Sequence, residues 1–195
     1  MDLPVVELRR YTLVPGRREE MISIFEQELM DPQQAAGMSV LGTFRDLDEP
    51  DHFVWMRGFS DMATRRRVLT DFYSGPVWKQ QGPRIRPTME DTDDVYLLRP
   101  AGPGTGLGPL PLPAPDPSPG GLVVVRVRPD AGPADPGEFA RFVTEPAENT
   151  YPALPIRTGV SVVVTLSRGA HPGPGEPGTA RLVPTARSPL RGGPA

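Results

Sequence analysis

Proline and glycine divide this chain into two halves that differ in how well they specify regular structure. Together they number 14 in residues 1–100 and 34 in residues 101–195. Proline removes a backbone hydrogen-bond donor, and glycine loses more conformational entropy on ordering than other residues do. We therefore expect the better-defined secondary structure in the first half. Residues 101–120, which are rich in both, are predicted to be a semi-extended linker.

Residue patterns in the first half predict elements in the order β-α-β-β-α-β. Runs of β-branched and aromatic residues indicate strands, and apolar residues at three- and four-residue spacing indicate helices. The predicted strands are residues 5–13, 38–46, 52–59 and 94–99. The predicted helices are residues 17–30, stopped by Pro32, and a second one from the N-cap Ser60 to residue 71; residues 75–91 are predicted to be irregular. This order is typical of a ferredoxin-like α+β fold, in which both helices cover one face of an antiparallel sheet.

The second half echoes the strands of the first but not its helices. Strands are predicted at residues 122–128, 139–144, 160–167 and 179–184. The ten residues before Phe139 are too few for a helix with its turns, and residues 168–178 hold too much proline and glycine to be helical. We interpret this half as a duplicated unit whose helices are shortened or lost. A second sheet is also the natural cover for the open face of the first one.

Three segments resemble the NIPSNAP family, in particular its bacterial branch. They are VVELRRYTLVPG at residues 5–16, FVWMRGFSDM at residues 53–62 and FYSGPVW at residues 72–78. The resemblance implies a dimeric α/β barrel, in which two ferredoxin-like sheets face each other within one chain or between two chains. It implies a NIPSNAP repeat at residues 1–100 and a degenerate second repeat at residues 121–191. The wider superfamily contains cofactor-free monooxygenases, haem enzymes and plain binders, so the fold does not fix a reaction.

Composition excludes several classes of function. Acidic residues outnumber basic ones by 24 to 21, and the formal net charge of −3 does not favour nucleic acid as a partner. Cysteine is absent, which excludes disulfides, thiolate nucleophiles and cysteine-based zinc sites. The N-terminal residues do not read as a signal peptide, and no apolar run approaches the ~20 residues that span a bilayer. We expect a cytoplasmic protein that does not bind membranes.

Strand alternation nominates the residues of a ligand pocket. We expect Val6, Leu8, Val54 and Met56 to face the helices, because they are apolar. The residues between them would then face the second sheet, where aromatic and guanidinium groups suit a planar or anionic small molecule. The pocket candidates are Arg9, Tyr11, Arg45, Trp55, Arg57, Tyr73 and Trp78. The alternative is that the aromatics are core and that Glu7 and Arg9 pair across the interface.

We expect neither a metal nor a cofactor. His52 lies beside a predicted turn and His171 lies in a proline- and glycine-rich stretch, so no ligand cluster is visible. The acidic run of Glu90, Asp91, Asp93 and Asp94 is expected to be a solvated loop. Twenty of the 21 basic residues are arginine, which indicates a compositional bias and lowers the weight of any single arginine.

The leading hypothesis is a small-molecule-binding α/β-barrel protein, either a plain binder or a cofactor-independent enzyme of secondary metabolism. Arg9, Tyr11, Arg45 or Arg57 would orient an anionic or phenolic ligand, and Trp55 would help to form an apolar wall. No residue stands out as a general base, so no catalytic residue is assigned. The alternative is a non-catalytic module for self-association or protein interaction, and the sequence leaves open whether the barrel is a homodimer or intramolecular.

Overall fold

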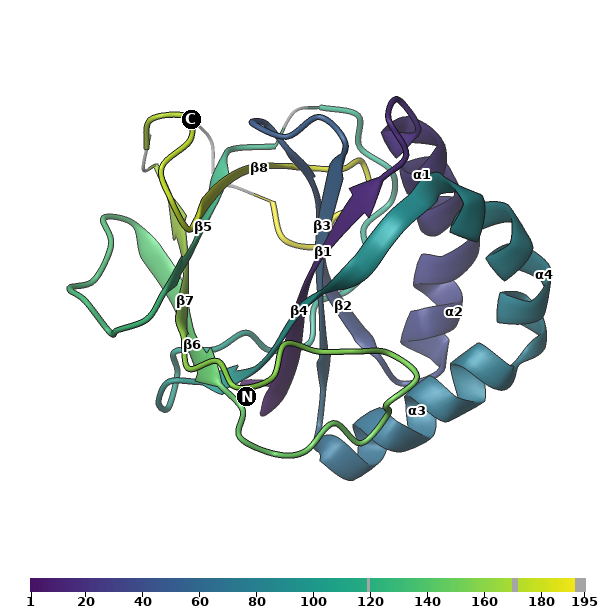
Figure 1. Ribbon diagram of the computed structural model, residues 1–195, viewed down its shortest axis with the longest axis horizontal. Coiled ribbons are helices and arrows are strands. Elements are labelled where there is room, and N and C mark those ends of the chain that lie inside the picture. The colour runs from purple at the N-terminus through teal and green to yellow at the C-terminus, as the bar shows by residue number, and fades with distance from the viewer. Residues whose placement is uncertain (119, 170–171, 192–195) are drawn as a thin grey trace.

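Eight strands of the described chain close into one antiparallel barrel, and helices cover the outside of one half of it (Figure 1). The computed structural model describes residues 1–118, 120–169 and 172–191. The N-terminal half contains β1 (Val5–Leu13), α1 (Arg18–Ile24), the π-helix η1 (Phe25–Leu29), α2 (Met30–Ala35), β2 (Ser39–Asp46), β3 (His52–Phe59), α3 (Met62–Ser74), α4 (Pro76–Ile85), the 3-10 helix η2 (Arg86–Thr88) and β4 (Met89–Pro100). The C-terminal half contains β5 (Val123–Arg128), β6 (Glu138–Thr144), β7 (Val163–Arg168) and β8 (Thr179–Pro184).

The two halves arrange their strands in the same order. The N-terminal sheet runs β4-β1-β3-β2, and the C-terminal sheet runs β8-β5-β7-β6. Antiparallel pairing of β2 with β8 and of β4 with β6 joins the two sheets, so the chain's own second half covers the first sheet. The expected α+β ferredoxin-like barrel is confirmed. The shared strand order supports the proposed duplication, which remains an interpretation.

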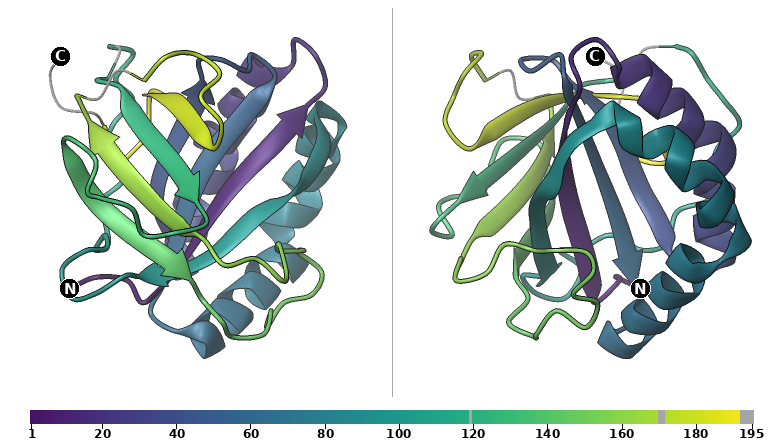
Figure 2. Two further views of the ribbon diagram at one scale, coloured as in Figure 1. Left: turned by 60° about the vertical axis from the view of Figure 1, so that its left-hand side comes forward. Right: turned by 45° about the vertical axis from the view of Figure 1, so that its right-hand side comes forward.

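The outer face of the C-terminal sheet is polar and does not need helices. Between β5 and β8 the described residues form no helix, and Figure 2 shows a bare sheet on this side of the barrel. The loop after β5 brings Asp135 onto the face, where it accepts hydrogen bonds from Arg128 at 2.7 Å and Thr165 at 2.5 Å. Arg126 lies 3.4 Å from the same carboxylate. Asp135 therefore supplies a counter-charge for the arginines on this face, where a helix would have to bury them, although Arg126 Nη1 and Arg128 Nη1 have no hydrogen-bond partner among the described residues.

The first helix continues past Pro32, where the sequence predicts its end. A π-helical stretch, η1, interrupts the α-helical ladder, and the N–H of Met30 donates to the carbonyl of Phe25. A new α-helical segment starts at Met30, so Pro32 lies in its first turn. A proline is tolerated there because the N–H groups of a first turn need no intrahelical acceptor. The predicted stop at Pro32 is therefore wrong.

The stretch predicted to be irregular, residues 75–91, is mostly helical. Two of its helix-breaking residues fit their positions: Pro76 is the first residue of α4, and Gly82 leaves room for the Trp78 ring, which a Cβ there would approach to 3.3 Å. Pro83 lies inside α4. The acidic run that we expected in a loop lies on β4, and the N-cap of α3 is Asp61 instead of Ser60. No helix in the described residues has the length and apolar character to cross a membrane.

Two apolar cores lie on opposite faces of the N-terminal sheet, and their composition reverses the predicted orientation. Val6, Leu8 and Met56 pack inside the barrel against strands of the second half. Tyr11 and Trp55 pack in the core beneath the helices. The prediction failed because both faces of this sheet are buried, so alternation separates the faces without saying which one meets the helices.

The expected linker is extended and packs on the body of the protein. Residues 101–118 form no helix or strand. The Leu3 N–H donates to the carbonyl of Leu107 at 2.8 Å, and the Gln34 side chain donates to the carbonyl of Leu110 at 3.3 Å. Leu107 and Leu110 contribute to the barrel core. The segment is therefore held against the barrel along part of its length.

Candidate functional site

A cavity of about 350 Å³ lies between the N-terminal sheet and its helices. This volume falls in the range of about 300–1,000 Å³ that small-molecule sites occupy. Strands β1, β3 and β4, the helices from α1 to α4, and the loop between β6 and β7 all contribute to its wall. The lining residues are Tyr11, Met21, Phe25, Leu29, Gln33, Trp55, Phe72, Tyr73, Trp78, Ile85, Arg86, Met89, Thr92, Tyr151, Ala153 and Leu154.

Aromatic side chains form two groups in this wall. On the sheet side, Trp55 meets Phe25 edge-on with ring centroids 4.9 Å apart, and Tyr11 at 6.1 Å. On the helix side, Tyr73 meets Trp78 edge-on at 4.8 Å. Tyr151, from the C-terminal half, stacks on Tyr73 with centroids 6.0 Å apart. The arrangement offers flat apolar surfaces of the kind that hold an aromatic ligand.

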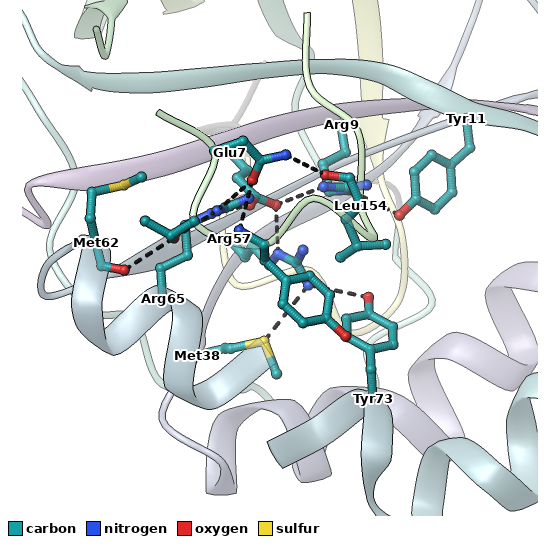
Figure 3. A network of polar contacts seen from close by, with 12 residues as sticks. Glu7, Arg9, Tyr11, Met38, Arg57, Met62, Arg65, Tyr73 and Leu154 are labelled. Atoms are coloured by element: carbon teal, nitrogen blue, oxygen red, sulfur yellow. Dashed lines mark hydrogen bonds and ion pairs between the residues drawn. The ribbon is translucent and has the colours of Figure 1, made fainter. Parts of the chain in front are cut away.

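A fully buried ionic cluster lies beside the cavity (Figure 3). The Glu7 carboxylate accepts hydrogen bonds from Arg9 Nη1 at 2.8 Å, Arg57 Nε at 2.8 Å and Arg65 Nε at 2.7 Å. All four side chains have no solvent exposure. Three guanidiniums and one carboxylate give the cluster a net charge of +2. Each arginine also keeps one Nη2 group that has no hydrogen-bond partner among the described residues.

The arginines determine the charge state of Glu7. Burial by itself would raise the pKa of Glu7, but Arg57, Arg9 and Arg65 outweigh burial and hold that pKa far below its usual range. The carboxylate is therefore ionised at any physiological pH and cannot act as a general base near neutrality. Arginine also stays charged, so the excess of positive charge persists.

Two tyrosines connect the ionic cluster to the cavity. Arg9 Nε donates to the Tyr11 hydroxyl at 2.9 Å, and Arg57 Nη1 donates to the Tyr73 hydroxyl at 3.4 Å. Both tyrosines line the cavity. The Arg57 guanidinium also lies 5.0 Å from the Trp55 ring centroid, within cation–π range. The positive charge therefore lies directly behind the aromatic wall.

A strap from the C-terminal half, residues 149–156, closes one side of the cavity. Arg65 Nη1 donates to Asn149 Oδ1 at 3.0 Å and to Thr150 Oγ1 at 3.2 Å, so the ionic cluster anchors the strap. Within the strap, the Asn149 side chain donates to the carbonyl of Leu154 at 2.8 Å. Tyr151 and Leu154 are thereby held against the cavity. The second half of the chain thus completes a site that the first half begins.

Two buried polar atoms in residues that line the cavity lack a hydrogen-bond partner in the described part of the chain. They are Trp55 Nε1, a donor, and Gln33 Oε1, an acceptor, and each residue is 1% exposed. Buried polar groups are satisfied in the great majority of cases, so unpaired ones at a cavity point to a missing ligand or water. Gln33 is there because α2 extends beyond the predicted stop at Pro32.

The structure brings six of the seven predicted pocket residues together. Four of them line the cavity (Tyr11, Trp55, Tyr73 and Trp78), and two belong to the ionic cluster behind it (Arg9 and Arg57). Arg45 is elsewhere: it pairs with the exposed Glu19 on α1 at 2.5 Å and is not among the lining residues.

Sequence reasoning missed Arg65, Gln33 and Tyr151. A signal for Arg65 was present, because it shares the helical face of Met62, Leu69 and Phe72, and an arginine on an apolar face needs a buried partner. No local signal places Tyr151 at the site, since its contacts with the helices are long-range in the sequence.

A second, smaller cavity of about 210 Å³ lies between the two sheets at one end of the barrel. This is where the sequence places the pocket. Leu8, Val54 and Val125 form its apolar part. Among its charged groups, Arg157 Nε donates to Asp94 at 2.6 Å and Arg10 Nη2 donates to Asp46 at 3.3 Å, while Arg10 Nε has no partner among the described residues. The larger cavity, with its aromatic wall and the buried ionic cluster beside it, is the candidate site.

Comparison with known proteins gives one family match. The NIPSNAP family model matches residues 6–101, and no curated protein matches the sequence. A NIPSNAP-like domain protein from Burkholderia xenovorans is 25% identical, covers 58% of this chain and 98% of its own, and has a TM-score of 0.51. A NIPSNAP family protein from Agrobacterium tumefaciens is 21% identical, covers 52% of this chain and 94% of its own, and has a TM-score of 0.48.

A putative monooxygenase from Lactobacillus acidophilus resembles the whole barrel. It covers 96% of this chain and 98% of its own with a TM-score of 0.52, at 9% identity. At that identity the similarity concerns the fold alone. The family assignment rests on the N-terminal half, where the sequence match and the ferredoxin-like elements coincide. By this match, residues 6–101 of the chain form a NIPSNAP domain.

Proposed function

We propose that this protein binds a small aromatic organic molecule in the cavity between the N-terminal sheet and its helices. The observation that carries the proposal is an aromatic cavity of about 350 Å³ backed by a buried cluster with excess positive charge. A packed core would fill this space, and a buried guanidinium excess destabilises a protein unless something compensates it. A ligand that stacks on the aromatic rings would fill the space.

Binding is a better-supported function than self-association. A self-association module would use the open face of the N-terminal sheet, but the chain's own C-terminal strands cover that face. The strap also brings Tyr151 and Leu154 to the cavity, so both halves contribute to one wall.

The cavity offers few groups that could take part in catalysis. The described lining residues include no carboxylate and no histidine, and their titratable groups are three tyrosines and Arg86. Glu7 is held ionised by its arginines. We therefore propose ligand binding without assigning a reaction, and any chemistry on the ligand would depend on the tyrosine hydroxyls.

The two tryptophans allow a direct test. The chain has only two, Trp55 and Trp78, and both line the cavity. Tryptophan emission therefore reports on this cavity. Native mass spectrometry of the purified protein and a screen of small aromatic acids, amides and phenols should reveal compounds that bind with a saturable change in tryptophan emission.

A cavity-blocking variant and a matched control locate the binding. Ala153, on the strap, is exposed and also lines the cavity, so Ala153→Phe can block the cavity without disturbing the core. Ala114 is exposed in the connecting segment, and Ala114→Phe is the control. We expect the first variant to abolish the emission change and the second to keep it. Equal binding by both variants would contradict the proposal, as would a screen without any saturable ligand.

A further inference from the structure

The hydroxyls of Tyr11 and Tyr73 are arranged as a pair of polarised donors. Each accepts a hydrogen bond from a buried arginine, Tyr11 from Arg9 and Tyr73 from Arg57. Each hydroxyl therefore keeps its own proton free for another acceptor, since a phenol both accepts and donates. Figure 3 shows both oxygens pointing toward the region beside the two guanidiniums. Both residues also line the same cavity.

The arginines strengthen these donors. A hydroxyl that accepts from a charged guanidinium is polarised and donates more strongly, because hydrogen bonds in a chain reinforce one another in a medium of low dielectric constant. The Tyr11 hydroxyl also stays protonated, because burial raises its pKa and Arg9 offsets this only in part. At neutral pH Tyr11 is therefore a donor and not a phenolate.

The cluster behind the phenols carries more positive than negative charge. Its net charge is +2, and one Nη2 on each of Arg9, Arg57 and Arg65 has no partner within the described ranges. The arginines themselves are not among the cavity-lining residues, so a ligand meets the tyrosine hydroxyls first. An anion bound at the hydroxyls would be stabilised by the electric field of the buried positive charge without contacting the arginines.

We propose that Tyr11 and Tyr73 jointly bind the anionic oxygens of a small aromatic carboxylate, with Arg9 and Arg57 as positioning and polarising residues behind them. This inference rests on the proposed function and assigns its ligand class. The aromatic ring of the ligand lies among Trp55, Trp78 and Tyr151, and its carboxylate points toward the sheet. The same arrangement discriminates against a neutral amide of equal shape, because the amide offers one acceptor and brings no charge to the buried excess.

Matched acid and amide pairs test this ligand class. The probes are benzoate with benzamide and 3-phenylpropionate with 3-phenylpropanamide, measured by calorimetry and by tryptophan fluorescence at pH 7. The wild-type protein should bind each acid about tenfold or more tightly than its amide, because hydrogen bonds to charged groups are the stronger ones. Equal affinities within each pair would overturn the proposal.

Substitutions assign the preference to the two hydroxyls. The double variant Tyr11→Phe, Tyr73→Phe should weaken acid binding more than amide binding and so abolish the acid preference. Tyr151→Phe is the matched control, because Tyr151 lines the same cavity and stacks on Tyr73, and its hydroxyl bonds to no arginine among the described residues. It should keep the acid-to-amide ratio. An unchanged ratio in the double variant would contradict the proposal, and amide affinity together with thermal unfolding shows whether that variant is folded.

Failure of this inference is distinguishable from failure of the proposed function. If acids and amides bind equally and Ala153→Phe blocks both, the cavity is a binding site without an anion preference. If neutral aromatic compounds bind and none of the acids does, the inference fails alone. If neither the acids nor the neutral compounds bind, the proposed function and this inference both fail.

Discussion

Replacing Glu7 by glutamine tests the buried ionic cluster that supports the cavity wall. Glutamine keeps the shape of the side chain and one acceptor, but it leaves three guanidiniums without a counter-charge inside the protein. Breaking a buried ion pair by removing one partner costs about 3–5 kcal/mol. The whole stability of a domain is only about 5–15 kcal/mol. The variant should therefore lose a large part of its stability.

The expected shift can be measured by calorimetry or urea unfolding. For a chain of this size, each kcal/mol corresponds to about 2–4 °C in melting temperature, so Glu7→Gln should melt about 6–20 °C below the wild type. Glu19→Gln is the control: Glu19 also binds an arginine, Arg45 at 2.5 Å, but its side chain is 65% exposed. A surface ion pair contributes about 0–1 kcal/mol, so this variant should shift by a few degrees at most.

The pH dependence gives a second, independent readout of Glu7. Its pKa in the folded protein is held below the ordinary value of 4.5, so the unfolded chain takes up a proton first as the pH falls. The stabilisation by Glu7 is therefore complete above pH 4.5 and declines progressively as the pH falls below it. The wild type should lose stability in this acid range, and Glu7→Gln should lack that component. Equal melting shifts for Glu7→Gln and Glu19→Gln, with parallel acid profiles, would refute the reasoning.

Two further predictions concern the C-terminal half. Gly137 has φ +68, and an added Cβ would lie 1.9 Å from the Arg168 carbonyl oxygen; Gly175 has φ +73 and nothing within 4 Å. By thermal unfolding, Gly175→Ala should cost about 1–2 kcal/mol of left-handed strain and Gly137→Ala clearly more, so equal costs would contradict the described β6–β7 pairing. Deleting residues 101–195 removes the strands that cover Val6 and Leu8, and we expect the truncated chain to associate or aggregate in light scattering; a folded monomer would contradict the role given to the second half.

The strands were predictable because short β-branched runs end at clear turns. Residues 5–13, 52–59 and 179–184 were predicted with the bounds that the structure has. Three residues expected to interrupt a helix lie within helices. Pro32 and Pro76 occupy first helical turns, where proline is tolerated, and Gly82 makes room for Trp78. Residue type alone does not reveal such positions, because they depend on where a helix restarts and on what packs beside it.

The sequence predicted most residues of the site, but it placed them on the wrong side of the N-terminal sheet. Alternation correctly grouped Arg9 and Tyr11 on one face of β1, yet it could not tell which buried face meets the helices. The polar face lies toward the helices because Arg65, from α3, joins Glu7 there. Tyr151 could not be found from local patterns, since the long loop between β6 and β7 brings it to the cavity.

Methionine methyl NMR tests the location of the ligand most directly. Met21 and Met89 line the cavity between sheet and helices, whereas Met56 is buried inside the barrel. In protein labelled at the methionine methyl groups, a saturating aromatic acid should shift the resonances of Met21 and Met89 and leave that of Met56 in place. Shifts confined to Met56, or none at all in the presence of every acid and amide tested, would contradict the account.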